Sequence, residues 1–133
     1  MKKFVFVGCV LVVFLGVILL VRQRSKPPSD ADIRQKIVGT WSPASSSGHS
    51  FTATTEMSRD GSFVTTWTTA TNVIEIDGRW SVQGGLVTMT MTNVVGTDSH
   101  SLGPPVQRYR IARIGSREMV SYMGGETNVM ERK

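Results

Sequence analysis

The chain has 133 residues, 40% of them hydrophobic, with a formal net charge of +5 and a sequence pI near 9.9. Five of its fifteen basic residues precede Pro27, namely Lys2, Lys3, Arg22, Arg24 and Lys26. From Ser29 onward ten basic residues face ten acidic ones, so this part of the chain is neutral. A neutral domain has little long-range field to attract phosphate backbones, which argues against nucleic acid as a partner.

The first predicted element is membrane-spanning. Residues 4–21 form an unbroken run of 18 uncharged, mostly branched or aromatic residues. As a helix this run would be about 27 Å long, close to the thickness of the hydrocarbon core of a bilayer. The sequence therefore predicts a basic tail at 1–3, a transmembrane helix at 4–21, a basic proline-containing linker at 22–29 and one domain at 30–133. The membrane is the first expected partner, through a single-pass anchor.

Two alternatives to an uncleaved signal-anchor stay open. A cleaved signal peptide needs small residues at its cleavage site, whereas Leu19, Leu20 and Val21 are bulky and a basic cluster follows at once. A lipoprotein signal needs an apolar stretch before its cysteine, whereas only residues 4–8 of the run precede Cys9. Cys9 is more simply interpreted as a small apolar side chain within the membrane helix.

The orientation of the anchor depends on its flanking charges. Cationic residues favour the cytoplasmic side, but the two flanks carry about the same charge. Two weaker features favour an extracytoplasmic domain. Lys2-Lys3 at the start of the chain is the usual opening of a signal-anchor, and residues 30–133 contain no cysteine.

A short helix is predicted at the start of the domain. Ser29 or Asp30 can cap its N-terminus, and the helix would continue through Lys36. Acidic residues fall in its first turn and Lys36 in its last, as the helix dipole favours. Gly39 is placed to end it.

Beyond this helix the composition turns to Thr, Ser, Val, Trp, Met and Gly, with turn residues about every ten positions. We expect strands at about 39–44, 50–57, 62–69, 73–82, 86–94, 106–114, 118–123 and 126–132. Alternation predicts which side chains share a face: Phe63 with Thr65 and Trp67, Val87 with Met89 and Met91, and Tyr109 with Ile111. Eight short antiparallel strands can form a sandwich or a closed barrel. We expect an all-β, eight-stranded antiparallel meander barrel, because closure removes exposed edges.

Several short motifs occur in an order that resembles the lipocalin-like (calycin) domains, in particular the small bacterial ones, over about residues 30–132. They are Gly39-Thr40-Trp41, Asp60-Gly61-Ser62-Phe63, Gly78-Arg79-Trp80 and Tyr109-Arg110-Ile111. The resemblance implies a barrel in which Trp41, from the Gly39 motif, closes one end. It also implies that Arg132, from the last strand, stacks on this tryptophan.

Catalytic chemistry is not indicated by the sequence. The two histidines, His49 and His100, fall in predicted loops. Asp98-Ser99-His100 contains the residue types of a catalytic triad, but adjacent residues on an extended chain point to opposite sides. Two distant histidines and no cysteine in the domain do not form a zinc site. We therefore expect a protein that is not an enzyme and uses no cofactor.

Methionines give one sharper hypothesis. Met89 and Met91 share a strand face, and soft sulfur ligands select Cu(I). Methionine is also an adaptable filler of irregular cores, and it can line an apolar pocket. Copper binding by these two residues remains an alternative to both of those roles.

The sequence as a whole predicts a membrane-anchored, lipocalin-like domain that binds a small apolar ligand or a protein partner without catalysis. If a pocket exists, we expect Trp67, Met89, Met91 and Tyr109 to line it. The alternative from another class is a structural or assembly module that docks onto a complex of the cell envelope. A packed barrel with an exposed apolar patch would favour that alternative.

Overall fold

The computed structural model describes residues 26–44, 51–96 and 105–133. The predicted transmembrane helix at 4–21, the tail at 1–3 and most of the linker at 22–29 lie outside these residues. His49 and the Asp98-Ser99-His100 segment lie outside them as well. Within the described ranges, no helix has the length and apolar character needed to cross a membrane.

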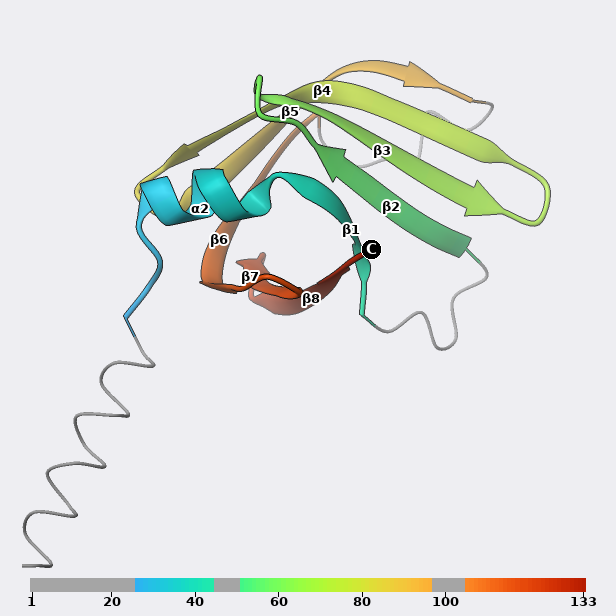
Figure 1. Ribbon diagram of the computed structural model, residues 1–133. Helices are drawn as coiled ribbons and strands as arrows, with labels where there is room; N and C mark the ends of the chain where they lie inside the picture. The colour runs from blue at the N-terminus through green and yellow to red at the C-terminus, as the bar shows by residue number, and fades with distance from the viewer. Residues whose placement is uncertain (1–25, 45–50, 97–104) are drawn as a thin grey trace, which may run out of the picture.

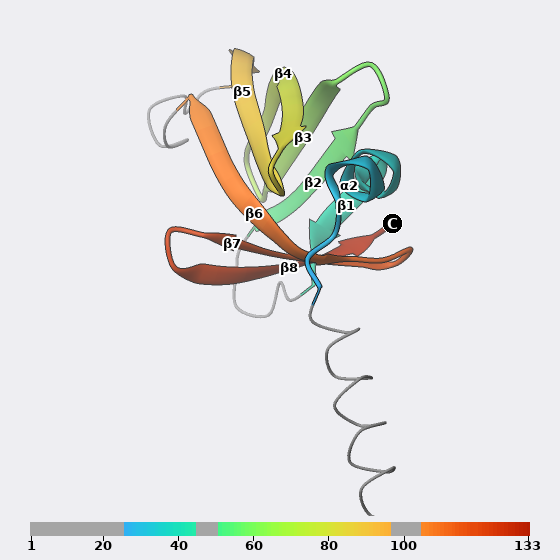
Figure 2. The same ribbon diagram turned by 90° about the vertical axis from the view of Figure 1, so that its left-hand side faces the viewer.

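Eight antiparallel strands form a closed barrel in which each strand pairs with the next and the last pairs with the first (Figures 1 and 2). The strands are β1 (Gly39–Pro43), β2 (Phe51–Met57), β3 (Ser62–Thr69), β4 (Val73–Gln83), β5 (Leu86–Val95), β6 (Val106–Ile114), β7 (Glu118–Met123) and β8 (Glu126–Arg132). Each predicted strand is present, with ends that differ by at most one residue. The predicted all-β meander barrel is thus confirmed.

The tightest turns follow directly from the sequence. Gly84 and Gly85 join β4 to β5 with φ values of 60° and 74°, and Gly124 and Gly125 join β7 to β8 with 59° and 86°. Two consecutive residues with positive φ are what a two-residue hairpin turn of the type I′ family requires, and glycine adopts them without strain.

Helix α2 (Asp30–Ile37) packs against β4 and β6 at one end of the barrel (Figure 1). Ser29 is its N-cap, accepting a hydrogen bond from the Asp32 backbone N–H. Ile33 and Ile37, four residues apart on one face, are fully buried. The helix runs one residue beyond the predicted Lys36, and Val38 rather than Gly39 is its C-cap.

Two polar contacts fix α2 to the hairpin of β4 and β5. The Asp30 carboxylate accepts hydrogen bonds from the backbone N–H groups of Gly84 (2.9 Å) and Gly85 (2.7 Å). The Arg34 guanidinium donates to the Val82 carbonyl (2.8 Å). These contacts hold the helix over the strand ends, so that one end of the barrel is closed.

Buried side chains fill only part of the barrel. Four of them belong to the same buried cluster as the two isoleucines of α2 and do not line the cavity described below: Val82, Val87, Ile111 and Ile114. An antiparallel meander places the β4–β5 and β6–β7 turns at this closed end. The remaining buried residues lie farther along the same strands, and most of them line the cavity.

Candidate ligand-binding cavity

The closed end of the barrel is built around Trp41 and Arg132. Trp41 is 1% exposed, and its indole Nε1 donates a hydrogen bond to the Ile37 carbonyl (2.7 Å). The Arg132 guanidinium carbon lies 4.5 Å from the centre of the tryptophan ring, within the range of a cation–π contact. The last strand and the first strand are therefore joined by side chains as well as by backbone pairing, which aligns Trp41 with Arg132.

The same guanidinium donates hydrogen bonds to carbonyls at the C-terminal end of helix α2. Its Nη1 donates to the Val38 carbonyl (2.8 Å) and its Nη2 to the Lys36 carbonyl. A cation at this end of a helix is favoured by the free carbonyls and by the helix dipole. The buried Nε of the same guanidinium has no hydrogen-bond partner within the described part of the chain.

Gly39 is required at this junction. Its φ is +135°, and a Cβ at this position would lie 2.2 Å from Nη1 of Arg132. A larger residue would therefore displace the guanidinium from the helix end. The structure brings together the three residues that the resemblance assigned to barrel closure: Gly39, Trp41 and Arg132.

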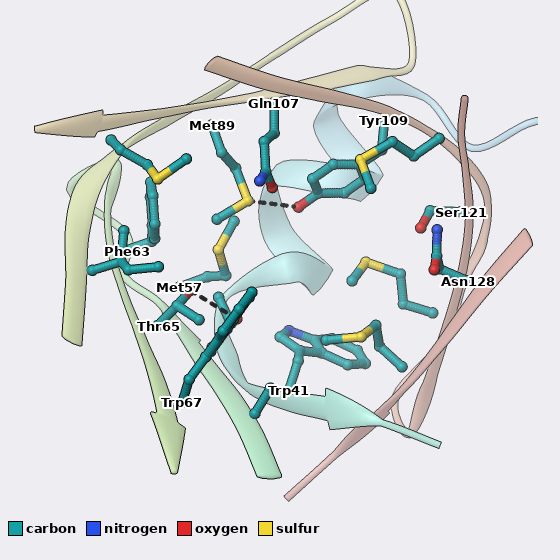
Figure 3. A pocket seen from close by; sticks show the side chains of 17 residues that line it. Trp41, Met57, Phe63, Thr65, Trp67, Met89, Gln107, Tyr109, Ser121 and Asn128 are labelled. Carbon is teal, nitrogen blue, oxygen red and sulfur yellow. Dashed lines mark hydrogen bonds between the residues drawn. The ribbon is translucent and has the colours of Figure 1, made fainter. Parts of the chain in front are cut away.

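Beyond this closed end the barrel contains a cavity of about 230 Å³ (Figure 3). The four residues predicted for a pocket, Trp67, Met89, Met91 and Tyr109, all line it. Its other lining residues are Trp41, Ala53, Thr55, Met57, Phe63, Thr65, Ile76, Gln107, Met119, Ser121, Met123, Asn128 and Met130. That these residues bind a ligand stays a prediction.

Methionines are concentrated in this cavity. The chain has seven methionines, and all six that follow Met1 line the cavity. Only Met89 and Met91 were predicted from the sequence to line a pocket, and the other four methionines were not. The alternation of the strands could have predicted the shared position of these methionines, since Met119, Ser121 and Met123 are spaced two residues apart on β7 and so share a face.

The polar groups of the cavity are distributed unequally. On the wall formed by β2 and β3, the Thr55 and Thr65 hydroxyls hydrogen-bond to each other (3.0 Å). On the wall formed by β6, β7 and β8, the lining includes Gln107, Ser121 and Asn128. None of these three residues was predicted from the sequence, although Gln107 continues the alternation that places Tyr109 and Ile111 on one face.

The Tyr109 phenol is the one acidic group in the lining, and it is held neutral. Its hydroxyl lies 3.3 Å from the Met89 sulfur, to which it donates a hydrogen bond (Figure 3). Burial raises the pKa of this phenol far above its ordinary value, because ionisation would place an unsolvated charge inside the barrel. It therefore acts as a neutral donor.

No lining residue carries a formal charge at neutral pH. The described ranges also contain no cluster of three or more His, Cys, Asp or Glu residues able to hold a metal ion. The groups that remain are aromatic rings, thioethers, hydroxyls and amides. This combination suits a neutral molecule that is mostly apolar.

Comparisons with known proteins do not assign the chain to a family. No model of a known protein family matches it, and no curated protein shows significant sequence similarity to it. The class that the fold and site define is an eight-stranded antiparallel barrel with an internal cavity and a helix closing one end. This architecture is consistent with the lipocalin-like fold.

Proposed function

We propose that this protein is a membrane-anchored, lipocalin-like domain that holds a small, mostly apolar ligand inside its barrel without acting on it chemically. The observation that carries the proposal is the 230 Å³ cavity, lined by apolar, thioether and neutral polar side chains. Ligand sites of this kind are concave and mostly apolar, with a few polar groups that orient the ligand.

The size of the cavity limits the size of the ligand. Since an apolar cavity of about 150 Å³ holds benzene, which has six non-hydrogen atoms, a cavity of 230 Å³ has room for about nine. Long acyl chains and tetrapyrroles are too large to be enclosed whole in this volume. The ligand is therefore expected to be smaller than the drug-sized molecules held in cavities of about 300 Å³ or more.

The anchor belongs to the same proposal. Residues 4–21 have the length and apolar character of a transmembrane helix, and basic residues flank them. The linker reaches the domain at Pro27 and Pro28, directly before α2 and thus at the closed end of the barrel. We place the domain outside the cytoplasm, with the cavity on the side of the barrel away from the linker.

A thermal-shift experiment tests the ligand proposal. The full-length protein in lipid nanodiscs would be heated with neutral aromatic and aliphatic compounds of about nine non-hydrogen atoms, with fatty acids and with copper(I). A ligand present at 100 times its dissociation constant adds about 2.7 kcal/mol, which is several degrees for a domain of this size. Neutral compounds of the stated size should raise the transition temperature.

Two tryptophan variants locate the effect. Trp67 lines the cavity, whereas Trp80 does not, and its indole N–H donates to the Ser58 carbonyl (3.0 Å). Trp67→Ser should abolish the ligand-induced shift, and Trp80→Ser should preserve it even if the basal transition is lower. If no compound shifts the wild-type transition, the ligand proposal fails.

A docking module is the second candidate, and exposed apolar residues favour it. Val73, Val95 and Val106 lie at strand ends opposite α2, and they are 58%, 57% and 36% exposed. Met123, at the end of β7, is 43% exposed at the same end. If the thermal-shift experiment finds no ligand, this apolar rim becomes the leading site for contact with a protein of the cell envelope.

Copper(I) is the third candidate, and it rests on the six thioethers of the cavity. Met89 and Met91 were the pair considered from sequence, and the structure adds four more sulfur atoms to the same lining. Thioethers are soft ligands that favour Cu(I) over harder cations. A transition raised by copper(I) and by no organic compound would move this candidate to first place.

A further inference from the structure

The β6–β8 wall of the cavity carries three polar side chains. Gln107, Ser121 and Asn128 face the cavity, and none of their side chains has a hydrogen-bond partner among the described residues. Ser121 is only 4% exposed. On the opposite wall, by contrast, Thr55 and Thr65 satisfy each other. The hydroxyls on one wall of the cavity are therefore hydrogen-bonded to each other, whereas the polar side chains on the other wall can still bond to a ligand.

Ser121 and Asn128 form a pair across two strands. They are direct partners in the register of β7 and β8, and Figure 3 shows their side chains next to each other. The hydroxyl and the amide can each donate and accept a hydrogen bond. Ser121 is buried and Asn128 is half-buried, and both face the cavity, so an occupant with a donor and an acceptor can pair with both of them.

The occupant must be uncharged. An anion or a cation placed in this lining would lose its hydration and meet no opposite charge, which is strongly unfavourable. Tyr109, whose phenol stays protonated because burial raises its pKa, supplies no counter-charge either.

The rest of the lining favours a flat ring. Four aromatic side chains contribute to it, Trp41, Phe63, Trp67 and Tyr109, together with the six methionines. Thioether sulfur makes favourable contacts with aromatic rings, and methionine adjusts its shape to a planar partner. Aromatic pairs add further stabilisation beyond the area they bury.

We infer that the ligand is a neutral aromatic molecule of about nine non-hydrogen atoms whose single uncharged donor–acceptor group, such as a carboxamide, pairs with Ser121 and Asn128. The ring lies among the methionines and aromatic residues of the cavity. This inference rests on the proposed function and adds the chemical class of the ligand and the residues that select it.

Four compounds with nine non-hydrogen atoms each separate these features. Benzamide has the ring and the neutral polar group, cumene has the same branched shape without polar atoms, and benzoate has that shape with a negative charge. Heptanamide keeps the amide and replaces the ring by a chain. The methyl groups of the methionines, labelled with ¹³C in the full-length protein in nanodiscs, report binding by NMR, because all six that follow Met1 line the cavity.

Wild-type protein should bind benzamide more tightly than heptanamide, and it should not bind benzoate. The double variant Ser121→Ala/Asn128→Leu should bind benzamide about five- to hundredfold more weakly, since each lost hydrogen bond contributes about two- to tenfold. It should bind cumene as well as the wild type does, or more tightly. Each compound partitions into the nanodisc lipid to the same extent with both proteins, so this partition cancels in the ratio of the wild-type and variant dissociation constants.

Matched substitutions control for a general loss of structure. Ser42 is also buried, at 7% exposure, but it does not line the cavity. Asn93 lies on the exposed face of β5. The variant Ser42→Ala/Asn93→Leu should keep the wild-type affinity for benzamide. A variant that had merely unfolded would lose cumene binding together with benzamide binding.

Three outcomes would overturn the inference. They are equal binding of benzoate and benzamide, equal or tighter binding of heptanamide than of benzamide, and unchanged benzamide affinity in the Ser121→Ala/Asn128→Leu variant. In each of these cases binding of cumene or heptanamide would still support a small apolar ligand. If none of the four compounds shifts any methionine methyl signal, the proposed function fails along with the inference.

Discussion

The substitution Arg132→Met tests the closure of the barrel by one guanidinium. Methionine keeps an unbranched apolar stem but ends before the guanidinium, so the variant loses the stacked contact of that group with Trp41 and the donors to the carbonyls of Lys36 and Val38. Hydrogen bonds from a charged donor contribute about 1.5–3 kcal/mol each, and the exposed one of the two contributes less. Loss of the cation–π contact costs about 1 kcal/mol more. Part of this total is offset, because the variant no longer has to bury a cation.

The expected decrease in the free energy of unfolding is therefore about 2–3 kcal/mol. For an m-value of about 1.5 kcal/mol/M, the urea midpoint would fall by between about 1.3 and 2 M. Tryptophan fluorescence of residues 26–133, which hold helix α2 and all the strands of the described ranges, measures the transition. Arg132→Lys, which keeps the charge without the planar fork, should lie between the wild type and Arg132→Met.

Arg113→Met is the matched control. The Arg113 side chain is 70% exposed and pairs with Glu118 at the surface, so its loss should change stability by at most about 1 kcal/mol. If Arg132→Met costs no more than Arg113→Met, the assigned role of Arg132 in closing the barrel is wrong. A changed m-value would instead indicate that the denatured state had been altered.

Three further predictions concern backbone, pH and membrane. Gly78→Ala should destabilise the barrel by about 1–3 kcal/mol in urea, because a Cβ there would lie 2.1 Å from a carbonyl oxygen of β5. Gly115→Ala, whose Cβ would meet its nearest neighbour at 3.7 Å, should stay within about 0.5 kcal/mol, and equal costs would contradict the packing argument. The pKa of Asp30 is lowered from 3.8 by the backbone N–H groups of Gly85 and Gly84, so its contribution to stability is present above about pH 3.8 and is lost as the pH falls through the lower folded value. Urea midpoints measured from pH 7 to 2.5 should fall less steeply in Asp30→Asn, and an unchanged profile would contradict this linkage. The full-length protein should sediment with membranes and resist alkaline carbonate, whereas residues 26–133 should stay in solution; soluble full-length preparations shortened at the N-terminus would indicate a cleaved signal instead.

The strands could be predicted because their determinants are local. Alternating side chains and paired glycines such as Gly84-Gly85 define both the strands and the turns between them, and α2 follows from its cap and its two isoleucines. The Trp41–Arg132 contact was expected from the order of short motifs and their resemblance to a known family. These features can be predicted without knowing the pairing register of strands that are far apart in the sequence.

The cavity itself depends on non-local geometry. Bulges at Asp77/Gly78 and at Ile111/Arg113 shift the register of β4 and β6, which decides which side chains face the interior. Whether an eight-stranded barrel is filled or hollow depends on how its inward side chains meet. In the sequence, Ser121 and Asn128 look like ordinary strand residues. Only the closed barrel shows that both lie beside the same cavity.

The central claim is that a small neutral molecule occupies the interior of the barrel. Nuclear Overhauser contacts between bound benzamide and the ¹³C-labelled methionine methyl groups test it most directly. We expect contacts from the ring protons to cavity methyls such as those of Met57, Met89 and Met119, and none to Met1. A protein saturated with benzamide that shows no contact from the ring protons to any cavity methionine methyl would contradict it.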